Sequence, residues 1–195
     1  GTKFGANITS KTSNIYLNGS IFNAPTTFEK TGSVENRSTG NNVFNSTVTF
    51  INSGSGEFRL GHGNPDIFNA DVTFTNTGTG RINTVCCAIG MQFNGNIIVN
   101  STGSGSDSGV HFSYYTPGTT TLAEGKTITV GGIGFSAGTL SFRNFTQTGT
   151  TPQSLTLTGT AGIGLGSGTT FNGDVTFTAP GLGLSGATFN GTATL

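Results

Sequence analysis

The residues that could perform acid–base chemistry are few and are spread along the chain. Eight of the 195 residues are Asp or Glu, and two are His. The densest polar group lies in the stretch EFRLGHGNPD, which contains Glu57, Arg59, His62 and Asp66. Cleavage of a glycosidic bond requires two carboxylates about 5–10 Å apart, and no such pair is evident here. NPD is an ordinary turn signal, so we interpret this group as a solvated loop.

The remaining titratable residues show no pattern of a catalytic or metal site. His111, in GVHFSYY, lies among aromatic residues and has no nearby cysteine or acid that would act as a triad partner, so we expect a surface or half-buried histidine. Cys86 and Cys87 are adjacent, and neighbouring strand positions point to opposite faces, so we expect no bridge between them. A metal site would need more Cys or His nearby. We therefore predict no catalytic residues, no metal and no cofactor.

Two glycine-rich stretches resemble ligand-binding loops only loosely. GSGSDSG (103–109) has one aspartate, whereas calcium repeats supply six or more oxygens from aspartates on successive turns. GGIGFSAG (131–138) is not followed by a helix that could present its N-terminus to a phosphate. We interpret the second stretch as a corner. Asp71 and Asp174 share an outward position but belong to well-separated parts of the chain.

The composition excludes several classes of protein. The net charge is zero and no basic run occurs, so we expect no nucleic-acid partner. No apolar run approaches the 18 or more residues of a membrane span. Low charge with 33 glycines could indicate disorder, but the 16 phenylalanines recur at regular places, as they would in a folded chain.

The regular places define a repeat. Close variants of IFNADVTF (67–74) occur along the chain, and the phenylalanine of each FN pair marks one unit. We expect Leu122 and Leu140 to stand in the same place in two further units. When these two leucines are included, consecutive markers are 18 to 31 residues apart. The marker phenylalanines are Phe4, Phe22, Phe44, Phe68, Phe93, Phe171 and Phe189.

Each unit alternates apolar and polar residues and then has a glycine-rich corner and a second short run. Alternation with a period of two indicates a half-buried strand, and glycine suits tight corners because it tolerates positive φ. An antiparallel sandwich would not require the same side chain to return in every unit. We therefore predict an all-β, right-handed parallel β-helix, or β-solenoid, formed by residues 1–195 as a single domain.

Stacked coils place equivalent residues in columns along the axis. The phenylalanines would form an aromatic ladder in the interior. The asparagines that follow them would form a second ladder through amide hydrogen bonds. The predicted asparagine ladder consists of Asn23, Asn45, Asn69, Asn94, Asn172 and Asn190.

A longer period is superimposed on the short one. Residues 1–28 align without gaps on residues 168–195, with nine identical positions. The chain is therefore expected to be one 167-residue super-repeat (1–167) and the start of the next (168–195). Eight coils would advance about 38 Å along the axis at the spacing of adjacent strands. Because neither end has a polar cap, we expect flanking copies and a much longer protein.

Three segments carry the resemblance of this chain to a known group: GNPDIFNADVTFTNTGTGRI, FNGNIIVNSTG and LAEGKTITVGGIGFSAGTLSFRNFTQTGTTPQSLTLTGT. They resemble the tandem repeats of very large secreted surface proteins of Bacteroidetes. The resemblance implies export to the cell exterior and a role as a stalk, fibre or adhesin. It implies no catalytic residues. The expected partners are flanking repeats of the same chain, identical chains in a bundle, and a glycan or protein target on a cell surface.

One outward column suggests an alternative function. Threonines are expected in the slot between the last two inward residues of each coil, with Ile98 interrupting them, and flat threonine arrays on β-solenoids bind ice. The neighbouring outward column is irregular and partly charged, and β-propensity alone selects threonine on a solvated face. The expected column is Thr9, Thr27, Thr49, Thr73, Thr129, Thr156, Thr176 and Thr194.

The longest insertions are expected around residues 105–120 and 143–154, where a solenoid would bind a ligand. Tyr114 and Tyr115 are the exposed aromatic candidates for contact with a glycan or a protein. These features favour a non-enzymatic, rigid and adhesive segment. An ice-binding solenoid and a carbohydrate-active β-helix enzyme remain the alternatives.

Overall fold

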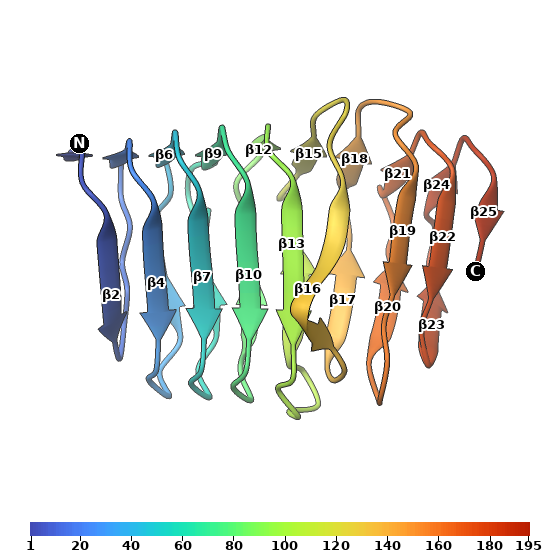
Figure 1. Cartoon of the computed structure of the whole chain (residues 1–195), viewed down its shortest axis with the longest axis horizontal. Helices are drawn as coiled ribbons and strands as arrows, with labels where there is room; N and C mark the ends of the chain where they lie inside the picture. Colours follow the sequence, from blue (N-terminus) through green and yellow to red (C-terminus); the bar gives the residue numbers. More distant parts are fainter.

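A computed structural model describes residues 1–195 and contains strands and connecting segments but no helix. All strand pairs are parallel, and the chain winds as a β-helix whose axis is horizontal in Figure 1. The strands nearest the viewer run downward, those behind them run upward, and the chain advances from left to right, which defines right-handed coiling. The predicted fold class is confirmed. No helix is present that could cross a membrane.

A typical coil contributes one strand to each of three faces. The first face is a nine-stranded sheet. Its strands are β1 (Lys3–Phe4), β3 (Ile21–Phe22), β6 (Val43–Phe44), β9 (Ile67–Phe68), β12 (Met91–Phe93), β15 (Thr120–Leu122), β18 (Phe145–Gln147), β21 (Thr170–Phe171) and β24 (Thr188–Phe189).

The second face consists of a six-stranded and a three-stranded sheet. The six strands are β2 (Ile8–Thr12), β4 (Thr26–Lys30), β7 (Val48–Asn52), β10 (Val72–Asn76), β13 (Ile97–Ser101) and β16 (Ile128–Phe135). The three strands are β19 (Gln153–Thr156), β22 (Val175–Thr178) and β25 (Ala193–Thr194).

The third face is a seven-stranded sheet. Its strands are β5 (Asn36–Arg37), β8 (Phe58–Arg59), β11 (Arg81–Asn83), β14 (Gly109–Phe112), β17 (Thr139–Phe142), β20 (Gly162–Leu165) and β23 (Gly181–Leu184).

The phenylalanines of the first face stack along the axis. The ring centroids of Phe44 and Phe68 are 4.9 Å apart and those of Phe68 and Phe93 are 4.8 Å apart, with the planes within 5° of parallel. This distance equals the spacing of adjacent strands, because each ring stands on its own coil. Phe4 and Phe22 extend the stack at one end, and Phe171 and Phe189 form a separate pair 6.1 Å apart.

A second aromatic column lies on the second face. Phe50 stacks on Phe28 at 5.8 Å and on Phe74 at 5.7 Å, and it meets Phe44 and Phe68 edge to face. The alternation of the sequence turns these rings inward, because successive strand residues point to opposite faces. The two columns therefore interlock across the interior.

The asparagine ladder lies along the corner that follows the first face. In this ladder, each side-chain nitrogen Nδ2 donates a hydrogen bond to the side-chain oxygen Oδ1 of the asparagine one coil earlier. The distances are 2.8 Å from Asn45 to Asn23, 2.8 Å from Asn69 to Asn45 and 3.0 Å from Asn94 to Asn69. Ala123 follows β15 and interrupts the ladder. Asn190 donates to Asn172 at 2.6 Å, which forms a second, shorter ladder.

One predicted marker is wrong, and Gln147 occupies the marker position in that coil. Leu140 pairs with Val110 and Ile163 in the third sheet, not in the first. In the first sheet, Leu122 pairs with Gln147 of the next coil. Phe145, two residues before Gln147, points into the core and meets Phe112 and Phe171. The error arose because both segments alternate, so that periodicity alone could not assign them to a face.

Two further expectations differ from the structure. Thr156 pairs with Thr178, whereas Ser154 pairs with Thr176, so the outward threonine column contains Ser154 in this coil. Residues 131–135 of GGIGFSAG are strand, not corner: they belong to β16, which is eight residues long. The register of β16 on β13 shifts after Val99, and the side chain of Gln153 then accepts a hydrogen bond from the Ile128 amide at 2.8 Å, where the six-stranded sheet ends.

The two ends of the chain have the same strand positions in the first face. In the segment 168–195, β21 and β24 occupy the positions that β1 and β3 occupy in the segment 1–28. The strands also pair in the same register, with Phe4 opposite Phe22 in one pair and Phe171 opposite Phe189 in the other. The aligned segments therefore occupy the same places in the first face, whereas residues 14–17 form no strand where β23 lies in the other segment.

Candidate functional site

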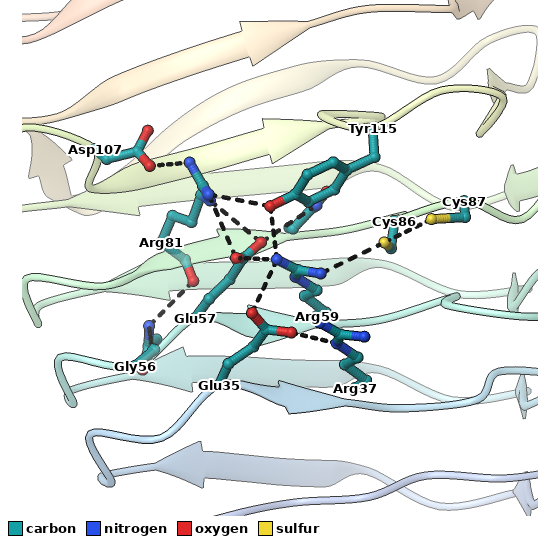
Figure 2. A network of polar contacts seen from close by, with 12 residues as sticks. Glu35, Arg37, Gly56, Glu57, Arg59, Arg81, Cys86, Cys87, Asp107 and Tyr115 are labelled. Carbon is teal, nitrogen blue, oxygen red and sulfur yellow. Dashed lines mark hydrogen bonds and ion pairs between the residues drawn. The ribbon is translucent and has the colours of Figure 1, made fainter.

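A cluster of charged and aromatic side chains covers the outer surface of the third sheet at β8 and β11 (Figure 2). Alternation in these strands turns Phe58 and Ile82 into the core and leaves Arg59 and Arg81 on the outside. Glu57 lies immediately before β8. Parallel stacking then places charges from successive coils side by side.

Glu57 is held between two arginines. Its carboxylate lies 2.9 Å from Nη2 of Arg59 and 3.2 Å from Nε of Arg81. Glu35, one coil earlier, lies 2.9 Å from Nη2 of Arg59. Arg37 pairs with Glu35, and Arg81 pairs with Asp107. Three acids and three arginines thus form one network with no excess charge.

Tyr114 and Tyr115 cover this network and do not project freely into solvent. The guanidinium of Arg59 lies 4.4 Å from the centre of the Tyr115 ring, and that of Arg81 lies 3.9 Å from the centre of the Tyr114 ring. Nη2 of Arg59 also donates to the Tyr115 hydroxyl at 2.6 Å. Both tyrosines are half-buried, so they differ from the exposed pair that the sequence suggests.

The electrostatics of Glu57 favour a permanent negative charge. Burial alone would raise the pKa of this carboxyl group, but hydrogen bonds from Arg59 and Arg81 outweigh burial and lower the pKa. A general acid of the glycosidase type requires a raised pKa. The arrangement therefore supports a structural ion-pair network more than an acid catalyst.

His111 is buried beneath the tyrosines. It is 3% exposed, in contrast to the surface or half-buried position expected from the sequence, and it packs edge to face on Tyr114. Neither ring nitrogen has a hydrogen-bond partner. Burial lowers the pKa of this imidazole to about 4, and the positive charge of Arg81 acts in the same direction.

Asp66 is separated from the Glu57–Arg59 pair and lies in the core. Its Oδ1 accepts hydrogen bonds from the amide and the side chain of Asn42, each at 2.8 Å, and its Oδ2 has no partner. Burial raises the pKa of this carboxyl group to about 6, although the bonds from Asn42 act against the shift. The stretch expected to be a solvated loop therefore contains one buried carboxyl group.

Asp71 and Asp174 have the same structural role in two different coils. Oδ1 of Asp71 accepts the backbone N–H of Asn96 at 2.8 Å, and Oδ1 of Asp174 accepts that of Thr192 at 2.7 Å. Each carboxylate thus links its own corner to the next coil. The separation expected from the sequence is present, and the two groups do not form a pair.

Cys86 and Cys87 lie in the corner after β11, not in a strand. The expectation that they point to opposite faces is wrong, because their sulfur atoms are 2.8 Å apart. His62, from the corner of the preceding coil, has a ring nitrogen within 4.8 Å of both sulfur atoms. This cluster was not predicted, because the corners lack the alternation by which strands of successive coils can be aligned.

No family model, curated protein or solved structure matches this chain.

Proposed function

We propose that this chain is a rigid segment of a long extracellular repeat protein, which acts as a stalk, fibre or adhesin at the cell surface. The observation that carries the proposal is that the strand positions and the register of the first sheet at the beginning of the chain return at its end. A block whose end repeats the geometry of its beginning can be followed by another block without a change of axis. Repetition then gives length.

The contacts between adjacent coils support stiffness along this axis. Adjacent coils are joined by parallel backbone hydrogen bonds on three faces, by the stacked rings around Phe44 and Phe68, and by the asparagine ladder. Bending would open one face and separate rings that now lie at the coil spacing. No metal or cofactor is required for this architecture.

The proposal is tested by measuring length against copy number. Chains with residues 1–167 present once, twice or three times before residues 168–195 are compared by small-angle X-ray scattering. One such block advances seven strand positions in the first sheet, from β1 to β21. We expect each added block to lengthen the particle by about 34 Å while its cross-section stays constant. A particle that thickens instead of lengthening would contradict the stalk function.

The cell-surface location needs a separate test. Antibodies raised against residues 1–195 are expected to label intact cells of the source organism, and brief protease treatment of those cells should remove the label. Labelling that requires permeabilised cells would contradict an extracellular role and would leave the length measurement unaffected.

The two alternatives have less support. The outward threonine column is interrupted by Ile98 and contains Ser154 in place of threonine, and the column two residues further along contains Lys11 and Glu29. A regular flat array is therefore not maintained. For a carbohydrate-active enzyme, Glu57, the most buried acid among those paired with arginines, is neutralised by two arginines. Absence of thermal hysteresis and of glycan cleavage is the expected result.

A further inference from the structure

Three metal-ligating side chains from two successive coils converge at one corner of the β-helix. The sulfur atoms of Cys86 and Cys87 are 2.8 Å apart, and a ring nitrogen of His62 lies within 4.8 Å of them. Cys86 is buried, whereas Cys87 and His62 are half-buried. The group is thus shielded by the corner but open to an ion from solvent.

The stacking of the corners fixes this arrangement. The amide of Cys86 donates to the carbonyl of Leu60 at 3.1 Å, and the amide of Cys87 donates to that of Gly61 at 3.4 Å. His62 directly follows these two acceptors, and its own amide donates to Ser38 in the coil before at 3.0 Å. Backbone pairing therefore holds all three ligands before any ion binds.

The donor atoms select the class of ion. Two thiolates and one imidazole form a soft ligand set, which prefers Cu(I) or Zn(II) over Mg²⁺ or Ca²⁺. No acidic residue belongs to the group, and Nη1 of Arg59 lies 4.0 Å from the sulfur of Cys86 (Figure 2). This positive charge opposes a bare dication but stabilises the two thiolates that form when an ion binds.

We propose that Cys86, Cys87 and His62 form a binding site for a single thiophilic d10 metal ion, Cu(I) or Zn(II). Binding releases the two thiol protons to solvent and forms two metal–sulfur bonds and one metal–nitrogen bond. Metal–sulfur bonds of about 2.3 Å and a metal–nitrogen bond of about 2.0 Å require the sulfur atoms to move about 1 Å apart by rotation of the two side chains. The ion would then link the corners of two successive coils.

The two thiol protons add a signature to ion binding. Thiols ligate an ion as thiolates, so the ion must displace their protons, and binding should therefore tighten as the pH rises from 6 to 8.

The test is direct metal binding by the reduced protein under anaerobic conditions. Cu(I) is titrated against bicinchoninate and Zn(II) against a chromophoric chelator, in separate experiments. We expect one equivalent of at least one of these ions to bind per chain. X-ray absorption of the complex should show two sulfur ligands and one nitrogen ligand.

Single substitutions identify the ligands. Cys86→Ser and Cys87→Ser should each weaken binding at least 100-fold, and His62→Ala should weaken it about 10-fold. Asn64→Ala is the matched control, because Asn64 is exposed in the same corner as His62 and is not a ligand. Its affinity should equal that of the unmodified protein. Circular dichroism of each apo variant verifies that the β-helix is retained.

Two results would overturn the proposal. The first is that neither ion binds the unmodified chain more tightly than it binds a Cys86→Ser/Cys87→Ser double variant. The second is that His62→Ala leaves the affinity and the nitrogen signal of the absorption spectrum unchanged, because the site would then be a dithiol without the imidazole. Neither measurement depends on the length or the cellular location of the protein.

Discussion

Among the individual residues, phenylalanine supplies the largest apolar contacts of the interior. Phe68 is fully buried, stacks on Phe44 and Phe93, and meets Phe50 and Phe74 edge to face. Burial of such a ring contributes about 1.5–3 kcal/mol, and aromatic pairs add about 0.5–1.5 kcal/mol each. The central rings of the ladder therefore hold adjacent coils together more strongly than any surface contact.

Removal of one central ring should be costly. We expect Phe68→Ala to lower the free energy of unfolding by about 3–5 kcal/mol, because it leaves a cavity between two coils. Thr73→Ala, at a half-buried outward position of the same coil, should change it by less than about 0.5 kcal/mol. Urea unfolding followed by circular dichroism measures both values. Equal effects of the two substitutions would contradict the ladder as a source of stability.

Asp66 and His111 should give opposite dependences of stability on pH. The folded-state pKa of Asp66 is raised from 3.8 to about 6, so its contribution is fully present below pH 3.8 and is lost as the pH rises through 6. The folded-state pKa of His111 is lowered from 6.5 to about 4, so its contribution is present above pH 6.5 and is lost as the pH falls through 4. Each group changes the free energy of unfolding by about 3 kcal/mol. Between pH 4 and 6 the two changes have opposite signs and nearly cancel.

Substitutions separate the two effects. In the Asp66→Asn variant, the free energy of unfolding should decrease by about 3 kcal/mol as the pH falls from 6.5 to 4. In the His111→Phe variant, it should decrease by about the same amount as the pH rises from 4 to 6. The double variant should again be nearly independent of pH in this range. Chemical denaturation at intervals of half a pH unit gives the slopes. Parallel slopes in the two single variants would show that the assignment is wrong.

Among the structural elements, each corner is specified by small or amide-bearing residues that repeat from coil to coil. A β-carbon added to Gly78 would lie 2.0 Å from the carbonyl oxygen of Gly54, and one added to Gly103 would lie 1.9 Å from that of Gly78. Glycine is needed there because the next coil passes too close for any side chain. At another corner, the asparagine ladder links coils through side chains.

A glycine substitution in this column should therefore disrupt stacking. We expect Gly78→Ala to destabilise the protein by about 2–3 kcal/mol, because the backbone of two coils must move apart. Gly132→Ala is the matched control, since a β-carbon at Gly132 meets no atom within 4 Å and its φ is not positive. Thermal unfolding distinguishes the two variants. A Gly78→Ala protein as stable as the control would show that the close approach has no energetic role.

The gap in the asparagine ladder permits a gain of stability. Ala123 occupies the ladder position after Asn94, where the corner amide pairs with Phe93 as in the other coils. Ala123→Asn should donate a hydrogen bond to the side chain of Asn94 and raise the free energy of unfolding by about 0.5–1 kcal/mol. Asn69→Ala, which breaks two existing bonds, should lower it by about 1 kcal/mol. Urea denaturation measures both changes, and loss of stability in Ala123→Asn would contradict a cooperative ladder.

In the molecule as a whole, the last coils expose residues that the interior coils bury. Leu182 is 42% exposed and Leu184 is 56% exposed, whereas Ile163 and Leu165, one coil earlier in the same columns, are each 1% exposed. Coils at an end are covered on one side only, and stability in a solenoid depends on nearest neighbours. The terminal coils should therefore open more readily than the centre.

Extension of the chain by a further coil should stabilise the coils at this end. When a copy of residues 29–60 is added after Leu195, we expect the amides of β22 and β23 to become at least ten-fold more protected from hydrogen exchange, with β10 unchanged. The added residues follow the register set by the alignment of 168–195 on 1–28. An extension of equal length with the order of residues scrambled is the control. Equal protection by both extensions would contradict templated stacking.

Local patterns in the chain were sufficient to predict the repeating unit, the parallel coil, the interior phenylalanine ladder and the asparagine ladder at the corner. Phe44, Phe68, Asn45 and Asn69 recur at fixed places beside alternating residues, and only a stack of like units satisfies all of them at once. Alternation is a local property of the strand, so it can be recognised without knowledge of distant contacts.

Only the packing between coils decided which face a strand joins in the coils of unusual length. The same packing decided which corners lie next to each other. The misplacement of Leu140 and Thr156 follows from this, since an alternating pattern fits any of the three faces. The Glu57–Arg59–Arg81 network and the Cys86–Cys87–His62 group were likewise not predictable. Their members belong to successive coils, and only the register of those coils, which is set by corners of variable length, brings them within contact distance.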